Sequence, residues 1–173
     1  MKSTARVATL PIHPMLILVP AGAFFSVLAF DIIYLLTDDA LWWQATIPAI
    51  AVGVVGGILA AIPGLIDLVT VVPRQQATGI GLLHGVLNLA ILGLFSWNGW
   101  MRWTIGLPPS PDAPHLGLWL SVVGGAALAV SSWLGWTMVY RYHVGVHEHP
   151  EALDPEPGLR GEEGEGTRGL AAD

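Results

Sequence analysis

The chain has 173 residues, of which 53% are hydrophobic and only 12% are charged. A soluble domain carries about twice that share of charge, so the composition is typical of a membrane protein of one domain. The chain has no cysteine, which excludes disulfides, thiolate metal sites and covalently attached haem, and its net charge of −6 gives no basic patch for nucleic acid.

The first predicted span runs from about residue 14 to residue 37 and carries one charge, Asp31. His13 and Pro14 precede its apolar run, and proline is favoured in the first turn of a helix, so we expect His13 near the N-cap. Small residues at 21–23 resemble a signal-peptidase site. Because only residues 15–19 form an apolar stretch before them, we expect the segment to remain as a span.

Two further spans are predicted at about 41–72 and 75–103. They contain the windows 40–66 and 75–101, which have no Asp, Glu, Lys or Arg and exceed the roughly 20 residues that cross a bilayer. The uncharged part of the earlier span ends at Asp67. His84 and Asn88 stand four residues apart in the later span, and therefore on one helix face.

The fourth predicted span covers about 116–142, and with it residues 10–146 form one transmembrane domain. The expected fold class is all-α, an integral membrane four-helix bundle. Residues 147–173 are predicted to be a disordered acidic tail, since they lack apolar periodicity. Residues 148–173 hold eight carboxylates and two arginines, an excess that matches the net charge of the whole chain.

Basic residues predict the orientation of the four spans. Lys2, Arg6, Arg74 and Arg141 fall on one side of a four-span chain, and only Arg102 falls on the other. The positive-inside rule then places both termini in the cytoplasm, with membrane lipid as the surrounding partner.

Counting residues from the outer helix ends, at about 1.5 Å per residue, gives the depth of each polar side chain. His13, Asp67, His84 and His143 fall in one layer toward the cytoplasmic side. Ionisable groups inside a membrane are costly, and a functional role is the default hypothesis for them. We therefore take His13, His84, Asn88 and Asp67 as the candidate cofactor or ligand layer, while a structural role or a simple helix cap remains the alternative for the histidines.

Asp31 lies near the outer end, where Arg102 is the available cation, and we expect the two to form a structural ion pair. His143, His147 and His149 lie beside the charged tail, and we expect them to be solvated rather than to bind a metal.

Four motifs, in order, resemble the bacterial membrane-protein family called domain of unknown function 2231. They are "LPIHPMLILVPAGAFFSVLAFDIIYLL", "AAIPGLIDL", "LLHGVLNL" and "SSWLGWTMVYRYHVGV", within about residues 10–146. The last motif departs from the family pattern by lacking a glycine after His143. The resemblance implies a bacterial inner membrane protein and a likeness to four-helix di-haem cytochromes b, which is a fold-level analogy.

The sequence leaves three functions open. The first is a non-catalytic accessory or assembly subunit, in contact with other membrane subunits or a second copy of itself. The second is an electron-transfer subunit with a b-type haem between His13 and His84, with Asn88 or Asp67 orienting an imidazole. The third is proton-linked transport through His84, Asp67 and Asp31. No nucleophile elbow, zinc motif or phosphate loop points to an enzyme.

Overall fold

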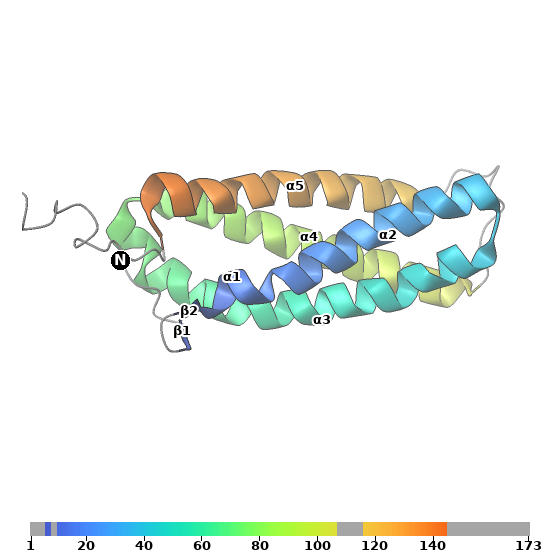
Figure 1. Ribbon diagram of the computed structural model, residues 1–173, viewed down its shortest axis with the longest axis horizontal. Helices are drawn as coiled ribbons and strands as arrows, with labels where there is room; N and C mark the ends of the chain where they lie inside the picture. Colours follow the sequence, from blue (N-terminus) through green and yellow to red (C-terminus); the bar gives the residue numbers. More distant parts are fainter. Residues whose placement is uncertain (1–5, 8–9, 107–115, 145–173) are drawn as a thin grey trace, which may run out of the picture.

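The computed structural model describes residues 6–7, 10–106 and 116–144. Four long helical segments lie side by side in an elongated bundle (Figure 1). A two-residue strand pair precedes them, with β1 (Arg6–Val7) antiparallel to β2 (Leu10–Pro11). The predicted acidic tail and the connecting residues 107–115 lie outside the described residues.

The first span is α1 (Ile12–Leu16) followed by α2 (Leu18–Thr37). The break at Ile17 has a local cause, because Pro20 has no N–H to donate to the carbonyl of Leu16 four residues earlier. The segment starts two residues before the predicted residue 14, which places His13 inside α1. His13 is the second residue of α1, so it lies in the first turn, near the N-cap as expected.

The second span is α3 (Ala40–Thr70), which Asp39 caps by accepting a hydrogen bond from the backbone N–H of Leu41 at 3.0 Å. A short 3-10 helix, η1 (Val72–Gln75), leads to α4 (Thr78–Ile105). The fourth span is α5 (Leu116–Tyr142). The predicted bounds 41–72 and 75–103 therefore differ from the structure mainly where η1 separates the two spans.

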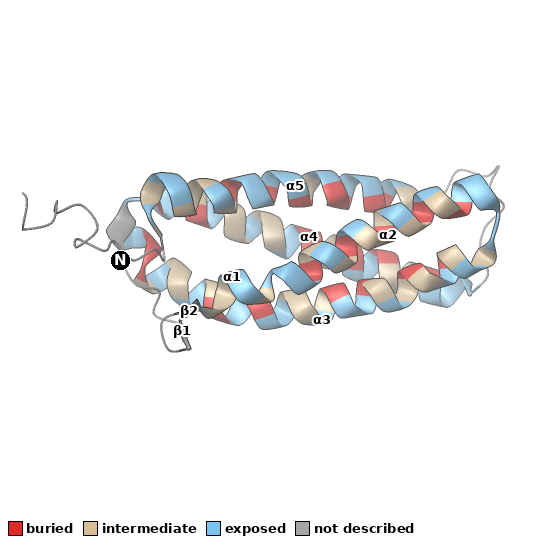
Figure 2. Cartoon of the chain, in the orientation of Figure 1, coloured by how far each residue is buried: buried red, intermediate tan, exposed pale blue. Residues whose placement is uncertain are grey.

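All four segments are long and apolar enough to cross a membrane. Most large apolar side chains on the outer faces are exposed, while the buried positions lie on the inner faces (Figure 2). This distribution suits a bundle surrounded by lipid, where the outer surface has no reason to be polar.

The centre of the bundle is apolar. The buried core consists of Phe24, Val27, Ile50, Ile91, Phe95 and Leu128. The rings of Phe24 on α2 and Phe95 on α4 stack with centroids 4.0 Å apart and planes at 6°. Gly53 on α3 lies directly against Phe24, and Gly124 on α5 lies against Phe95, so both glycines leave room for a ring that a Cβ would fill. This core separates two polar layers, one toward each end of the bundle.

Candidate functional site

The polar layer at the end where α2 meets α3 is built around Arg102 on α4. Its guanidinium pairs with both carboxylate oxygens of Asp31 on α2, at 2.7 Å from Nη1 to Oδ1 and 2.8 Å from Nη2 to Oδ2. Arg102 has no exposed surface, and Asp31 is 2% exposed. The predicted ion pair is thus present, and it is bidentate and buried.

Three further side chains complete the hydrogen bonding of Arg102. Asn98 accepts from Nε at 2.8 Å, Thr46 accepts from Nη1 at 3.0 Å, and Ser121 accepts from Nη2 at 3.2 Å. With the two bonds to Asp31, all five N–H donors of the guanidinium have an acceptor. We call Asp31, Thr46, Asn98, Arg102 and Ser121 the ion-pair network.

The ion-pair network draws on all four spans, since Thr46 belongs to α3 and Ser121 to α5. The close approach of α5 depends on Gly117, because a Cβ there would lie 2.9 Å from Nη2 of Arg102. A buried ion pair is tolerated when its remaining hydrogen bonds are satisfied, and this one meets that condition. The network therefore joins all four spans at this end of the bundle.

His13 is the first histidine of the other polar layer, at the end where α1 begins. Its Nδ1 lies 2.8 Å from the carbonyl oxygen of Ala60 on α3. A carbonyl only accepts, so Nδ1 carries a proton, and in the neutral ring Nε2 then carries the lone pair. Gly64 makes room for the ring, because a Cβ there would lie 2.8 Å from Nδ1.

His84 on α4 is held in the same way by α5. Its Nδ1 lies 2.9 Å from the carbonyl oxygen of Ser131 and 3.1 Å from the hydroxyl of the same serine. The carbonyl again fixes the proton on Nδ1. Gly135 faces the ring, with its Cβ position 3.3 Å from Cε1. Nε2 accepts a hydrogen bond from the amide of Asn88 at 3.1 Å.

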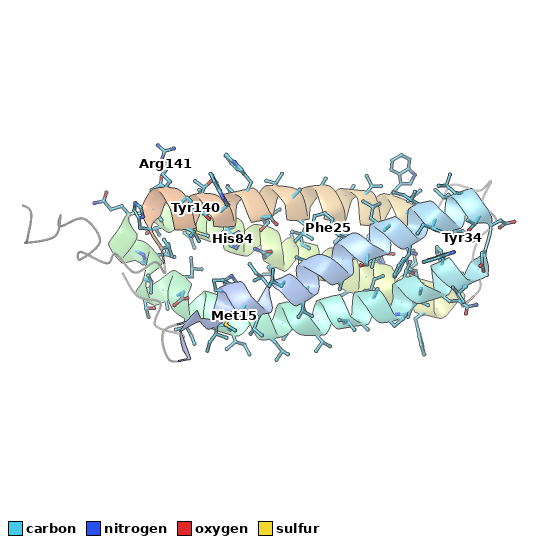
Figure 3. All side chains as sticks on the ribbon, in the orientation of Figure 1. Met15, Phe25, Tyr34, His84, Tyr140 and Arg141 are labelled. Carbon is cyan, nitrogen blue, oxygen red and sulfur yellow. The ribbon has the colours of Figure 1, made fainter. Side chains whose placement is uncertain are left out.

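The two imidazoles face each other across the bundle, with ring centroids 6.5 Å apart and planes at 89°. We call His13, His84 and Asn88, with the anchoring carbonyls of Ala60 and Ser131, the histidine layer. Figure 3 labels His84 in the half of the bundle that begins with α1, while Tyr34 lies near the opposite end. Tying the N–H of an imidazole to a backbone carbonyl is how proteins orient histidines that bind metals.

The other residues predicted for this layer play different parts. Asp67 is half-buried near the end of α3 and is not a hydrogen-bond partner of either imidazole. The carbonyls of Ala60 and Ser131 orient the rings, a role the sequence assigned to Asn88 or Asp67. His143 lies exposed just after α5, and His147 and His149 lie outside the described residues. Among the described residues, no three His, Asp or Glu side chains gather into a metal-binding group.

Sequence reasoning missed Thr46, Asn98, Ser121 and Ser131. Hydroxyl and amide side chains are common in membrane helices, and only their three-dimensional placement separates these from exposed ones. The glycines that face the histidine rings offered a signal, because each stands four residues after the anchoring carbonyl.

The family model described as "Predicted membrane protein (DUF2231)" matches residues 9–148 of this chain. The match takes in α1 to α5 and both polar layers. No curated protein and no solved structure matches the chain.

Proposed function

The chain belongs to the DUF2231 family of predicted membrane proteins, and on that premise we propose that it is an electron-transfer subunit of a membrane complex. In this proposal His13 and His84 would hold a b-type haem. The observation that carries it is the histidine pair, with both rings anchored through Nδ1 and facing each other at 6.5 Å.

The donor set of the structure fits this group. Two imidazoles from facing helices are donors that haem iron accepts, and the centroids of these two rings lie 6.5 Å apart. The amide of Asn88 now bonds to Nε2 of His84, so ligation requires this amide to turn away.

When bound, the haem would supply one-electron transfer. The chain itself would present neutral nitrogens of fixed orientation, since the carbonyls of Ala60 and Ser131 hold each proton on Nδ1. The Phe24–Phe95 core and the ion-pair network would keep the four helices in register around the site.

Visible absorption of the protein purified in mild detergent from haem-replete cells tests this proposal. We expect a Soret band and sharp α and β bands on reduction, which His13→Ala and His84→Ala abolish. His143→Ala is the matched control and should keep the spectrum, because His143 is exposed beyond α5. His84→Met keeps an iron ligand and should shift the bands instead of removing them. A colourless, folded wild-type protein overturns the haem assignment.

The second candidate is the non-catalytic assembly subunit. The ion-pair network favours this role, because the charges of Asp31 and Arg102 join two helices to each other. Gentle affinity purification tests it through recovery of defined partner subunits. Recovery of the chain alone under the mildest detergent contradicts this role.

The geometry supports proton-linked transport less well. His84 and Asp31 lie on opposite sides of the apolar core, where the stacked rings of Phe24 and Phe95 fill the centre of the bundle. A proton path needs a chain of polar groups or water between the two layers.

For location we propose the cytoplasmic membrane of a bacterium, with both chain ends inside. The burial of Arg102 supports this orientation, because its charge is neutralised by Asp31. The chain is free of cysteine, so a single Asp38→Cys change provides a probe of the α2–α3 connection. A membrane-impermeant maleimide should label it from outside intact cells. Labelling only after the cells are broken contradicts the orientation.

A further inference from the structure

Three pairs of residues that meet in the centre of the bundle have the same separation in sequence. Asp31 and Arg102, which form the ion pair, are 71 residues apart. Phe24 and Phe95, which stack, have this same separation, and so do His13 and His84, which face each other. Each pair joins the first span to the third, which run in the same direction through the bundle.

The supporting residues repeat with the same separation. Gly53 and Gly124 each lie against the phenylalanine of their own half. Gly64 and Gly135 each face the histidine of their own half. The hydrogen bond from each histidine to its anchoring carbonyl spans 47 residues in both halves. The same separation therefore relates the first span to the third and the second span to the fourth, with no insertion or deletion between the two halves.

Residues that lie next to a twofold axis contact their own symmetry mates. We propose that α1–α3 and α4–α5 are two copies of one helical hairpin, related by a twofold axis along the bundle, and that Asn88 breaks the symmetry so that His13 is the open member of the pair. Parallel repeats around an axis along the membrane normal are a known plan for membrane proteins.

The break in symmetry lies four residues after each histidine. In the second copy this position is Asn88, whose amide covers Nε2 of His84. In the first copy it is Ile17, which has no polar group to offer to His13. Nε2 of His13 has no hydrogen-bond partner among the described residues. Nε2 of His13 is also not fully buried. Among the described residues, Trp43 Nε1 is the one side-chain polar atom that is fully buried and has no hydrogen-bond partner.

The difference between the two imidazoles indicates a metal centre as the ligand, with His13 binding it before His84. In the neutral ring the open nitrogen carries the lone pair that would accept a metal centre, and Asn88 must release His84 before both rings can share that centre. This step rests on the proposed haem site, whereas the asymmetry between the two imidazoles does not.

Acylation by diethyl pyrocarbonate, which attacks unprotonated imidazole nitrogen, tests the asymmetry on the full chain without haem. Mass spectrometry of the digested protein gives the rate at each histidine. We expect His13 to react roughly fivefold or more faster than His84, because a hydrogen bond protects the latter. Asn88→Ala should raise the His84 rate toward that of His13. Circular dichroism and elution volume confirm that each variant is folded.

Exchange of the two positions tests the duplication itself. In the double variant Ile17→Asn/Asn88→Ile, equivalent copies should reverse the preference, so that His84 reacts faster. Ile17 is 39% exposed, so close packing does not confine the side chain that replaces it. Equal rates in the wild type, or an unchanged preference in the folded double variant, overturn the proposal. If the preference is found in a protein that never shows a Soret band, the haem proposal fails and the asymmetry stands.

Discussion

The two polar layers of this bundle differ in how completely their hydrogen bonds are satisfied. In the ion-pair network, Arg102 uses all five donors on four partners from the described residues. In the histidine layer, each Nδ1 is anchored, but only one of the two Nε2 atoms has a partner. The guanidinium of the first layer has no donor left for a ligand, whereas one imidazole of the second layer has a free nitrogen.

This contrast separates structural from functional polarity inside a membrane. Ionisable groups are rare and costly there in either role, so their presence alone does not decide between the two. The number of unused hydrogen-bond donors and acceptors in a layer separates a structural role from a functional one. Variants in the two layers should therefore lower stability in one case and mainly alter ligand binding in the other.

Asp31→Asn should have the largest effect on stability. It leaves the buried guanidinium of Arg102 without its counter-charge, and removing one partner of a buried pair costs about 3–5 kcal/mol. Unfolding in mixed micelles by titration with a denaturing detergent measures the change. A loss of stability below about 1 kcal/mol would show that water reaches Arg102 and that the network does not hold the helices together.

Gly64→Ala should have an intermediate effect that centres on the histidine layer. The added Cβ would lie 2.8 Å from Nδ1 of His13, so the ring must move and its bond to Ala60 weakens. Overpacking of this kind costs about 1–3 kcal/mol, and any Soret band should weaken as well. Unfolding and absorption on the same preparation give both values.

Gly22→Ala is the matched control for that change, because nothing lies within 4 Å of its Cβ position. We expect unchanged or slightly higher stability, by up to about 1 kcal/mol, from the better helix propensity of alanine. Equal losses in the two variants would mean that the ring contact at Gly64 is unimportant.

Two buried serines, one in each layer, compare the layers directly, and both should have smaller effects than Asp31→Asn. Ser121→Ala removes a partner of both Arg102 and Asn98, which we expect to cost about 1–2 kcal/mol. Ser131→Ala leaves the carbonyl anchor of His84 in place, so its cost should stay below about 0.5 kcal/mol. The reverse order would contradict the division between a saturated layer and an adaptable one.

Much of the architecture follows from the sequence, because charge-free windows of this length have few alternatives to membrane spans. The Asp31–Arg102 pair followed from the scarcity of cations at one end. Counting residues along straight helices predicted that His13 and His84 share a layer, but not that their rings face each other. The break at Ile17 did not, since it depends on the bond that Pro20 cannot make to Leu16.

The partners of these residues were harder to predict. The anchors of both histidines are backbone carbonyls, which every residue possesses, so no residue type identifies Ala60 or Ser131. The internal repeat escaped notice because most of its paired positions carry different residues, Asp31 and Arg102 among them. Its identical members are the His13–His84 and Phe24–Phe95 pairs with a few glycines and aliphatic residues, which are common in any membrane span.

The Asp31–Arg102 contact also says something about why the two hairpins belong to one chain. Separate identical hairpins around a twofold axis would set carboxylate against carboxylate, or guanidinium against guanidinium, in a site with no water to screen them. Once one polypeptide holds both copies, each position can mutate alone, and opposite charges become available at the centre. In the present chain these two equivalent positions hold a carboxylate and a guanidinium, which form the buried ion pair.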